Sequence, residues 1–89
     1  MHTQNQSIIV SGGSRGLGLH LVEQFLQAGN KVATFARSHT AAMDDLADRY
    51  REAFHFTPLD AVDAQGVTAF VMDVSDRFGS VDSVVNNAA

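Results

Sequence analysis

The sequence of 89 residues contains no cysteine and no tryptophan, and it has a single proline and a single tyrosine. Without cysteine there are no disulfide bonds or thiolate metal sites, and we expect a cytoplasmic protein. No apolar stretch approaches the roughly 20 residues of a membrane span, and the polar, uncharged start does not resemble a signal or transit peptide. The net charge of −4 argues against a nucleic-acid-binding surface.

Histidine is present but scattered, at positions 2, 20, 39 and 55, with no spacing typical of metal ligands. We therefore expect no metal site. No repeat, low-complexity tract or linker interrupts the chain. We interpret residues 1–89 as one small domain or as a portion of a larger one.

Apolar residues alternate between short continuous runs and helical spacing. The pattern predicts strands at 7–10, 31–36, 54–59 and 82–86, and helices at 17–27, 41–53 and 63–78. The connections are long enough for parallel neighbours, and such crossovers are right-handed. This order predicts an α/β protein that forms the N-terminal half of a doubly wound Rossmann fold, with a parallel sheet of strand order 3-2-1-4.

The predicted helix ends follow from local residue types. Gly29 and Gly79 suit the left-handed position that follows a helix. Thr40 and Asp63 are candidate N-caps for the second and third helices. Leu17 begins the apolar stripe by which the first helix is expected to pack against the sheet.

The first strand runs directly into a glycine-rich turn. Gly12, Gly16 and Gly18 have the spacing G-x-x-x-G-x-G, which differs from the commoner G-x-G-x-x-G. Glycine allows a tight turn and a close approach of backbone N–H groups to an anion. The helix that follows directs its positive dipole end at the same point. The segment therefore predicts a phosphate-binding loop, although a plain strand-to-helix turn is the alternative.

Four segments at the predicted strand ends resemble the short-chain dehydrogenase/reductase family, most of all its 3-oxoacyl-[acyl-carrier-protein] reductase branch. They are SGGSRGLG at 11–18, ARS at 36–38, LDA at 59–61 and VVNNAA at 84–89, and the resemblance covers nearly the whole chain. Ser11 departs from the family's usual threonine, and Ala89 from its usual glycine. The resemblance implies an oxidoreductase that passes a hydride between a nicotinamide cofactor and a carbonyl or alcohol, with 3-oxoacyl thioesters among the candidate substrates.

The resemblance also implies the cofactor contacts. In the glycine loop and after the later strands, the implied cofactor-binding residues are Gly12, Ser14, Arg15, Gly16, Leu17, Gly18, Arg37, Ser38, Asp60, Ala61, Asn87 and Ala88. The family's counterpart of Asp60 binds the adenine amino group, although a role in a turn is the commoner use of aspartate. Asn87 and Ala88 would border the ribose. A structural role for Asn86 is as well supported as a binding one.

The end of the second strand indicates the choice of cofactor. NAD-binding proteins place an acidic residue there to hold the ribose 2′-hydroxyl. This chain has Ala36 at that position, followed by Arg37 and Ser38, and Arg15 lies in the glycine loop. Guanidinium groups can bind a 2′-phosphate, which a carboxylate would repel. The sequence therefore predicts NADP rather than NAD.

No catalytic residue is expected within these 89 residues. The resemblance places the family's serine, its tyrosine and the lysine four residues after the tyrosine beyond residue 89. Tyr50 has Phe54 four residues on. We therefore expect an NADP-binding portion that is inactive alone and belongs to an NADPH-dependent enzyme with a small carbonyl substrate and a homo-oligomeric assembly. The alternatives are a non-catalytic dinucleotide-binding module and an inactive remnant.

Overall fold

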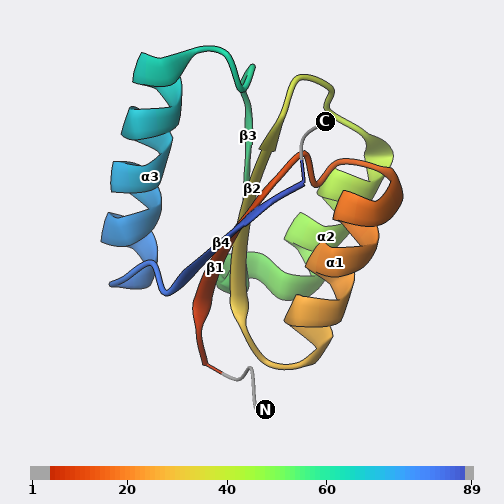
Figure 1. Ribbon diagram of the computed structural model, residues 1–89. Helices are drawn as coiled ribbons and strands as arrows, with labels where there is room; N and C mark the ends of the chain where they lie inside the picture. The colour runs from red at the N-terminus through yellow and green to blue at the C-terminus, as the bar shows by residue number, and fades with distance from the viewer. Residues whose placement is uncertain (1–4, 88–89) are drawn as a thin grey trace.

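The computed structural model describes residues 5–87, which form a parallel sheet between two layers of helix (Figure 1). The elements are β1 (Ser7–Ser11), α1 (Gly16–Gln27), β2 (Lys31–Ala36), α2 (Ala41–Tyr50), the 3-10 turn η1 (Arg51–Ala53), β3 (Phe54–Pro58), α3 (Ala64–Phe78) and β4 (Ser83–Asn86). The four strands have the order β3-β2-β1-β4 and all pairings are parallel. The predicted α/β fold and strand order are confirmed.

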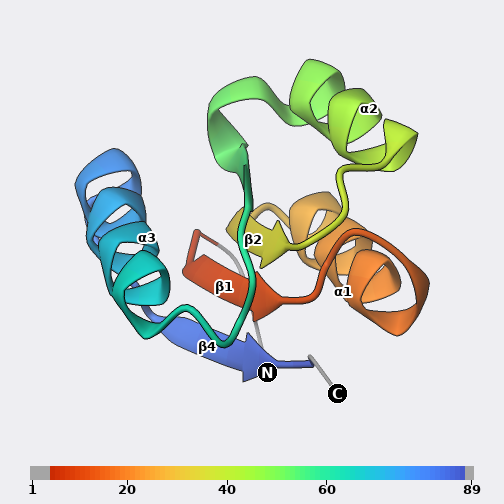
Figure 2. The same cartoon turned by 90° about the horizontal axis from the view of Figure 1, so that it is seen from above.

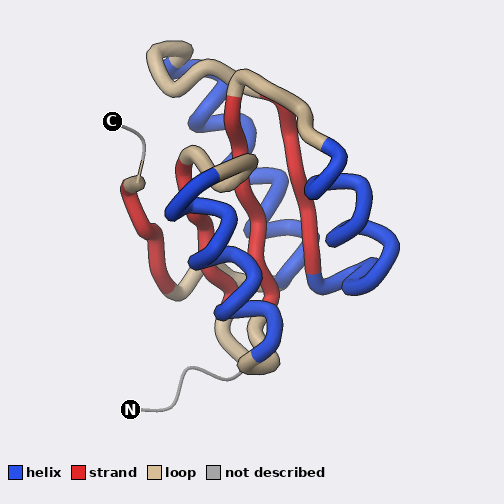
Figure 3. The backbone as a smooth tube through the Cα atoms, turned by 90° about the vertical axis from the view of Figure 1, so that its right-hand side faces the viewer, coloured by secondary structure: helices blue, strands red, loops and turns tan. Residues whose placement is uncertain are grey.

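The helices are divided between the two faces of the sheet. Helices α1 and α2 cover one face and α3 covers the other (Figure 2). Viewed from the side of α1 and α2, both helices run along the strands (Figure 3). Ile8 and Val10 belong to the apolar cluster with α1 and α2, whereas Ile9 belongs to the cluster with α3. This alternation is the two-residue period of a strand that is buried on both faces.

Three of the predicted helix ends are confirmed. Gly29 and Gly79 have left-handed φ values of 93° and 87°. Asp63 caps α3, because its Oδ1 accepts a hydrogen bond of 3.0 Å from the Gly66 N–H. Among residues 5–87, no helix is both long and apolar enough to cross a bilayer.

Three local expectations were wrong. Thr40 precedes α2, but its side chain makes no capping bond and instead donates to the carbonyl oxygen of Ser14, at 2.9 Å. Leu17 is 66% exposed and belongs to neither apolar cluster, whereas Val22 and Leu26 of the same helix are buried. The second helix ends as an α-helix at Tyr50, where Arg51 adopts a positive φ of 45° and begins the 3-10 turn.

A charged cluster joins β3 to α3 near one edge of the sheet. Nε2 of His55 lies 3.3 Å from Asp73, which also accepts a 2.8 Å bond from Arg77. The imidazole stacks on Phe70, and Thr57 lies 3.1 Å from its Nε2. Burial lowers the pKa of His55 below its usual range and the positive charge of Arg77 lowers it further, whereas Asp73 acts in the opposite direction. Neutral His55 is therefore the favoured folded form.

The lowered pKa of His55 predicts a pH-dependent stability. Because the unfolded chain takes up the proton first, we expect the free energy of unfolding to decrease as the pH falls below about 6.5. His55→Gln should reduce the drop in melting temperature between about pH 7.5 and pH 5.5. The exposed His20 provides the control, since His20→Gln should retain the pH dependence of the parent. Equal pH dependence in the parent and in His55→Gln would contradict the assignment.

Candidate functional site

The carboxyl ends of the strands lie at the upper edge of the sheet in Figure 1. Residues at this edge line a hollow of about 720 Å³. Eight of the residues predicted from the sequence line it: Gly12, Ser14, Arg15, Arg37, Ser38, Asp60, Ala61 and Asn87. Four further lining residues were not among the predicted site residues: Phe35, Ala36, Leu59 and Val62. Gly16, Leu17 and Gly18 form the adjoining first turn of α1. Ala88 lies outside the described residues.

The glycine loop takes a conformation that requires glycine at two of its positions. Gly12 and Gly16 have left-handed φ values of 72° and 61°. Gly18 approaches the loop so closely that a Cβ would lie 2.1 Å from the Gly12 carbonyl oxygen. At the start of α1, the first backbone N–H groups have no intrahelical acceptor, and the helix dipole favours an anion there. The loop therefore has the geometry of a phosphate site.

The end of β4 is joined to the same loop by hydrogen bonds. The hydroxyl of Ser11 accepts from the Asn87 N–H at 2.9 Å and lies 3.1 Å from Oδ1 of Asn86. Nδ2 of Asn87 donates to the Gly12 carbonyl oxygen at 3.2 Å. Asn86 thus has the structural role that the sequence left open. Asn87 connects β4 to the turn of the loop and also lines the hollow.

The end of β2 brings positive charge without a carboxylate. Arg37 and Ser38 are exposed and line the hollow together with Arg15 of the glycine loop. Within the described part of the chain, neither of these arginines has an ion-pair partner, whereas Arg49 and Arg77 are each paired with an aspartate. The two arginines of the hollow are therefore available to an anionic ligand.

Two neighbouring polar residues are engaged in local contacts. Oδ1 of Asp60 accepts from the Val62 N–H at 3.1 Å, which is the turn role considered from the sequence. His39 lies 3.0 Å from Asp44 and stacks on Phe56 with ring centroids 5.6 Å apart. His39 does not line the hollow, and the contact of Asp60 with adenine stays a prediction.

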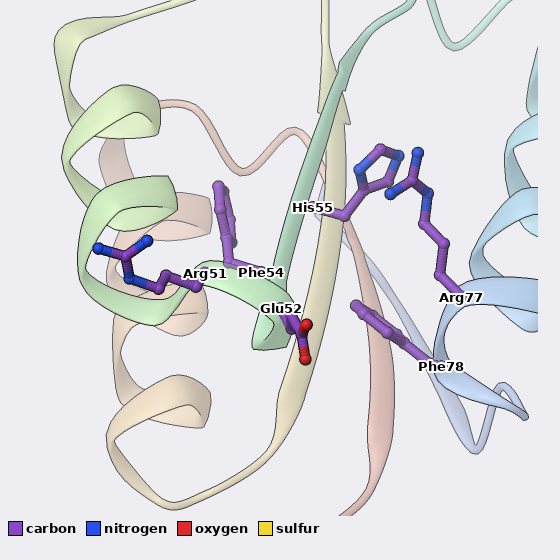
Figure 4. Close-up of a pocket in the computed structure, with 6 residues that line it drawn as sticks. All are labelled: Arg51, Glu52, Phe54, His55, Arg77 and Phe78. Atoms are coloured by element: carbon purple, nitrogen blue, oxygen red, sulfur yellow. The ribbon is translucent and has the colours of Figure 1, made fainter.

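A second hollow, of about 520 Å³, lies near the start of β3 and the end of α3 (Figure 4). In it, His55 and Arg77 lie close together, whereas Arg51 points away from them. Asp73 already neutralises Arg77. Across residues 5–87, no group of three or more histidine, aspartate or glutamate side chains could hold a metal ion. The hollow at the carboxyl edge is therefore the stronger candidate.

Comparison with known proteins identifies the family. The profile described as short chain dehydrogenase matches residues 6–89. The chain belongs to this family. Its members are oxidoreductases that bind nicotinamide dinucleotides, and the recognition made from the four sequence segments is confirmed.

Individual relatives agree with this assignment. The chain is 38% identical over 95 residues to the short chain dehydrogenase tazN of Aspergillus terreus, covering 99% of this chain and 20% of that protein. It is 33% identical to the 3-oxoacyl-[acyl-carrier-protein] reductase FabG of Chlamydia muridarum, covering 94% of this chain and 35% of the reductase. A solved short-chain dehydrogenase from Streptomyces avermitilis is 35% identical with a TM-score of 0.85, covering 97% of this chain and 31% of that one. The chain thus spans about a third or less of the length of these relatives.

The close approach of Gly18 to the loop yields a prediction. Gly18→Ala would force the methyl group against the Gly12 carbonyl and the Asn87 amide, at a cost of about 1–3 kcal/mol in stability. Because the clash displaces the loop itself, we expect NADPH and NADH to bind at least several-fold more weakly. Thermal melting and fluorescence titration measure the two effects.

Gly29→Ala is the matched control for this substitution. A side chain at Gly29 is also unfavourable, because this residue has a φ of 93°, but a Cβ there meets no atom within 4 Å. This variant should lose roughly 1–2 kcal/mol of stability and keep the affinity of the parent for both dinucleotides. Equal loss of affinity in the two variants would show that the loop is not the binding element.

Proposed function

We propose that this chain is the cofactor-binding portion of an NADP-dependent oxidoreductase that transfers a hydride between NADPH and a carbonyl or alcohol substrate. The observation that carries the proposal is the pair Arg15 and Arg37, which line the hollow without carboxylate partners. A guanidinium forms strong charge-assisted hydrogen bonds with phosphate oxygens. An NAD site would instead require an acidic residue where Ala36 stands.

The lining of the hollow has two parts, one for the diphosphate of a dinucleotide and one for its 2′-phosphate. The loop glycines provide space for the diphosphate, because none of them carries a side chain, and the start of α1 provides N–H donors for it. Arg15, Arg37 and Ser38 provide donors for the 2′-phosphate. When bound, NADPH supplies the hydride. The residues that line the hollow bind and orient the cofactor.

The substrate is proposed only as a class. The relative from Chlamydia muridarum is a 3-oxoacyl-[acyl-carrier-protein] reductase, so a 3-oxoacyl thioester is one candidate carbonyl substrate. In this function, residues 5–87 bind the cofactor and take no catalytic role. A non-catalytic dinucleotide-binding module would use the same hollow, and measurements of turnover separate the two functions.

The cofactor choice is tested by reversing one charge. Arg37→Asp replaces attraction for the 2′-phosphate with repulsion, so the Kd for NADPH should rise by about 10- to 150-fold, as expected for a lost charged hydrogen bond. The Kd for NADH should change little. Arg49→Asp makes the same change of charge on α2 outside the hollow and should leave both constants as in the parent. A parent that prefers NADH, or an equal loss of both cofactors in Arg37→Asp, would contradict the proposal.

The 89 residues alone should show no reductase turnover. Reduction of a carbonyl requires a proton donor at its oxygen, and general acid–base catalysis contributes about 10²- to 10⁴-fold. The test follows the oxidation of NADPH with a 3-oxoacyl thioester, in a preparation whose NADPH binding has been measured. Turnover that scales with the concentration of the purified chain would show that it contains catalytic groups.

A further inference from the structure

A buried threonine lies beneath the glycine loop. Thr34, in the middle of β2, is completely inaccessible to solvent. Its Oγ1 donates to the Val10 carbonyl oxygen at 2.5 Å and accepts a 3.0 Å hydrogen bond from the Gly13 N–H. One hydroxyl thus satisfies a strand carbonyl and a loop amide together. Such a group is not needed for strand formation alone, because valine fits a buried strand position equally well.

The loop packs directly on this hydroxyl. A Cβ at Gly13 would lie 2.2 Å from Oγ1 of Thr34 and 2.9 Å from Cγ2 of Val22. The preceding amide, of Gly12, donates to the Phe35 carbonyl oxygen at 2.8 Å. Two successive N–H groups of the loop are therefore bonded to two successive residues of β2. Both are directed into the protein and away from an anion in the hollow.

The strand that contains Thr34 also leads into the positively charged part of the hollow, at Arg37. Two residues after Phe35, β2 has ended and Arg37 lines the hollow. On the far side of the loop, the Ser14 carbonyl accepts from Thr40, which precedes α2. The glycine loop and the segment with Arg37 are consequently held as one unit, with Thr34 as the buried connection between them.

We propose that Thr34 is a positioning residue for the dinucleotide: its hydroxyl fixes the glycine loop on β2 so that the start of α1 meets the diphosphate. This inference rests on the proposed function of the hollow. Thr34 is buried and does not line the hollow, so it acts through Gly13. Removing the hydroxyl leaves the Gly13 N–H buried without an acceptor and releases the loop.

The test compares Thr34→Val, which keeps the shape and removes the hydroxyl, with Thr34→Ser, which keeps the hydroxyl. Thr34→Ala is a second variant without the hydroxyl should the valine variant fail to fold. Thr57→Val is the matched control, since Thr57 lies on the neighbouring strand and its hydroxyl bonds with His55 rather than with the loop. Two quantities are measured: hydrogen exchange of the Gly13 amide without ligand, and the Kd for NADPH and for NADH.

In Thr34→Val, exchange of the Gly13 amide should be faster by about tenfold, as for a lost hydrogen bond at a buried donor. The Kd for NADPH and for NADH should rise by a common factor, because the diphosphate is shared by both. Thr34→Ser and Thr57→Val should resemble the parent in both measurements.

Three outcomes would overturn the inference. A lower melting temperature with unchanged exchange at Gly13 would make Thr34 a purely structural residue. Faster exchange with unchanged affinities would show that the loop position does not govern binding. A loss confined to NADPH would place the effect at the 2′-phosphate rather than at the loop. If the parent binds neither dinucleotide, the proposed function fails, and the exchange data alone then decide whether Thr34 fixes the loop.

Discussion

The site depends on how the chain leaves β1. This strand pairs with β2 on one side and with β4 on the other, and all five of its residues are buried. Its carboxyl end is therefore held on both sides before the glycine loop begins. In a parallel sheet covered on both faces, the backbone at a strand end must find its hydrogen bonds within the protein. The loop does so through Phe35, Thr34 and Asn87.

The topology supplies the opening at that point. Helix α1 leads from β1 to β2 on one face, whereas α3 leads from β3 across the other face to β4 (Figure 2). The connection that leaves β1 and the connection that reaches β4 thus diverge to opposite faces of the sheet, and the strand order reverses between these two strands. Ligands of doubly wound folds bind at such a point. Asn87 stands at this divergence and bonds to the Gly12 carbonyl. The chain passes through β3 and α3 before β4 brings this polar residue back to the glycine loop.

Most of the fold could be predicted because its signals are local. The strand order followed from strand and helix alternation, and the ends at Gly29, Asp63 and Gly79 followed from residue types suited to those positions. The expectations for Thr40 and Leu17 were wrong for a tertiary reason. The hydroxyl of Thr40 donates to the carbonyl oxygen of Ser14, and Leu17 is exposed and belongs to neither apolar cluster.

The hollow was predicted only in part, again because tertiary structure brings some of its residues together. The motif segments indicated eight of its lining residues. They also contain Ala36 and Leu59, which were not among the predicted site residues, whereas Phe35 and Val62 lie just outside the segments. Thr34 was not recognised either. Its role depends on the register that sets it opposite Val10, and in the sequence it looks like an ordinary strand residue.

The two parts of the hollow differ in the kind of recognition they can provide. The loop presents backbone groups that are held by buried hydrogen bonds. Salt screens these bonds little, and a substitution disturbs them only by altering the local structure. The arginines are exposed side chains whose attraction for a phosphate is weakened by salt over a Debye length of about 8 Å at physiological ionic strength. In the proposed function, affinity for the diphosphate that both cofactors share therefore rests on the packing of the sheet, through contacts such as that of Thr34 with Gly13. In the proposed function, discrimination between the two cofactors rests on surface charge at Arg15 and Arg37, and a change in that charge requires no change in the core.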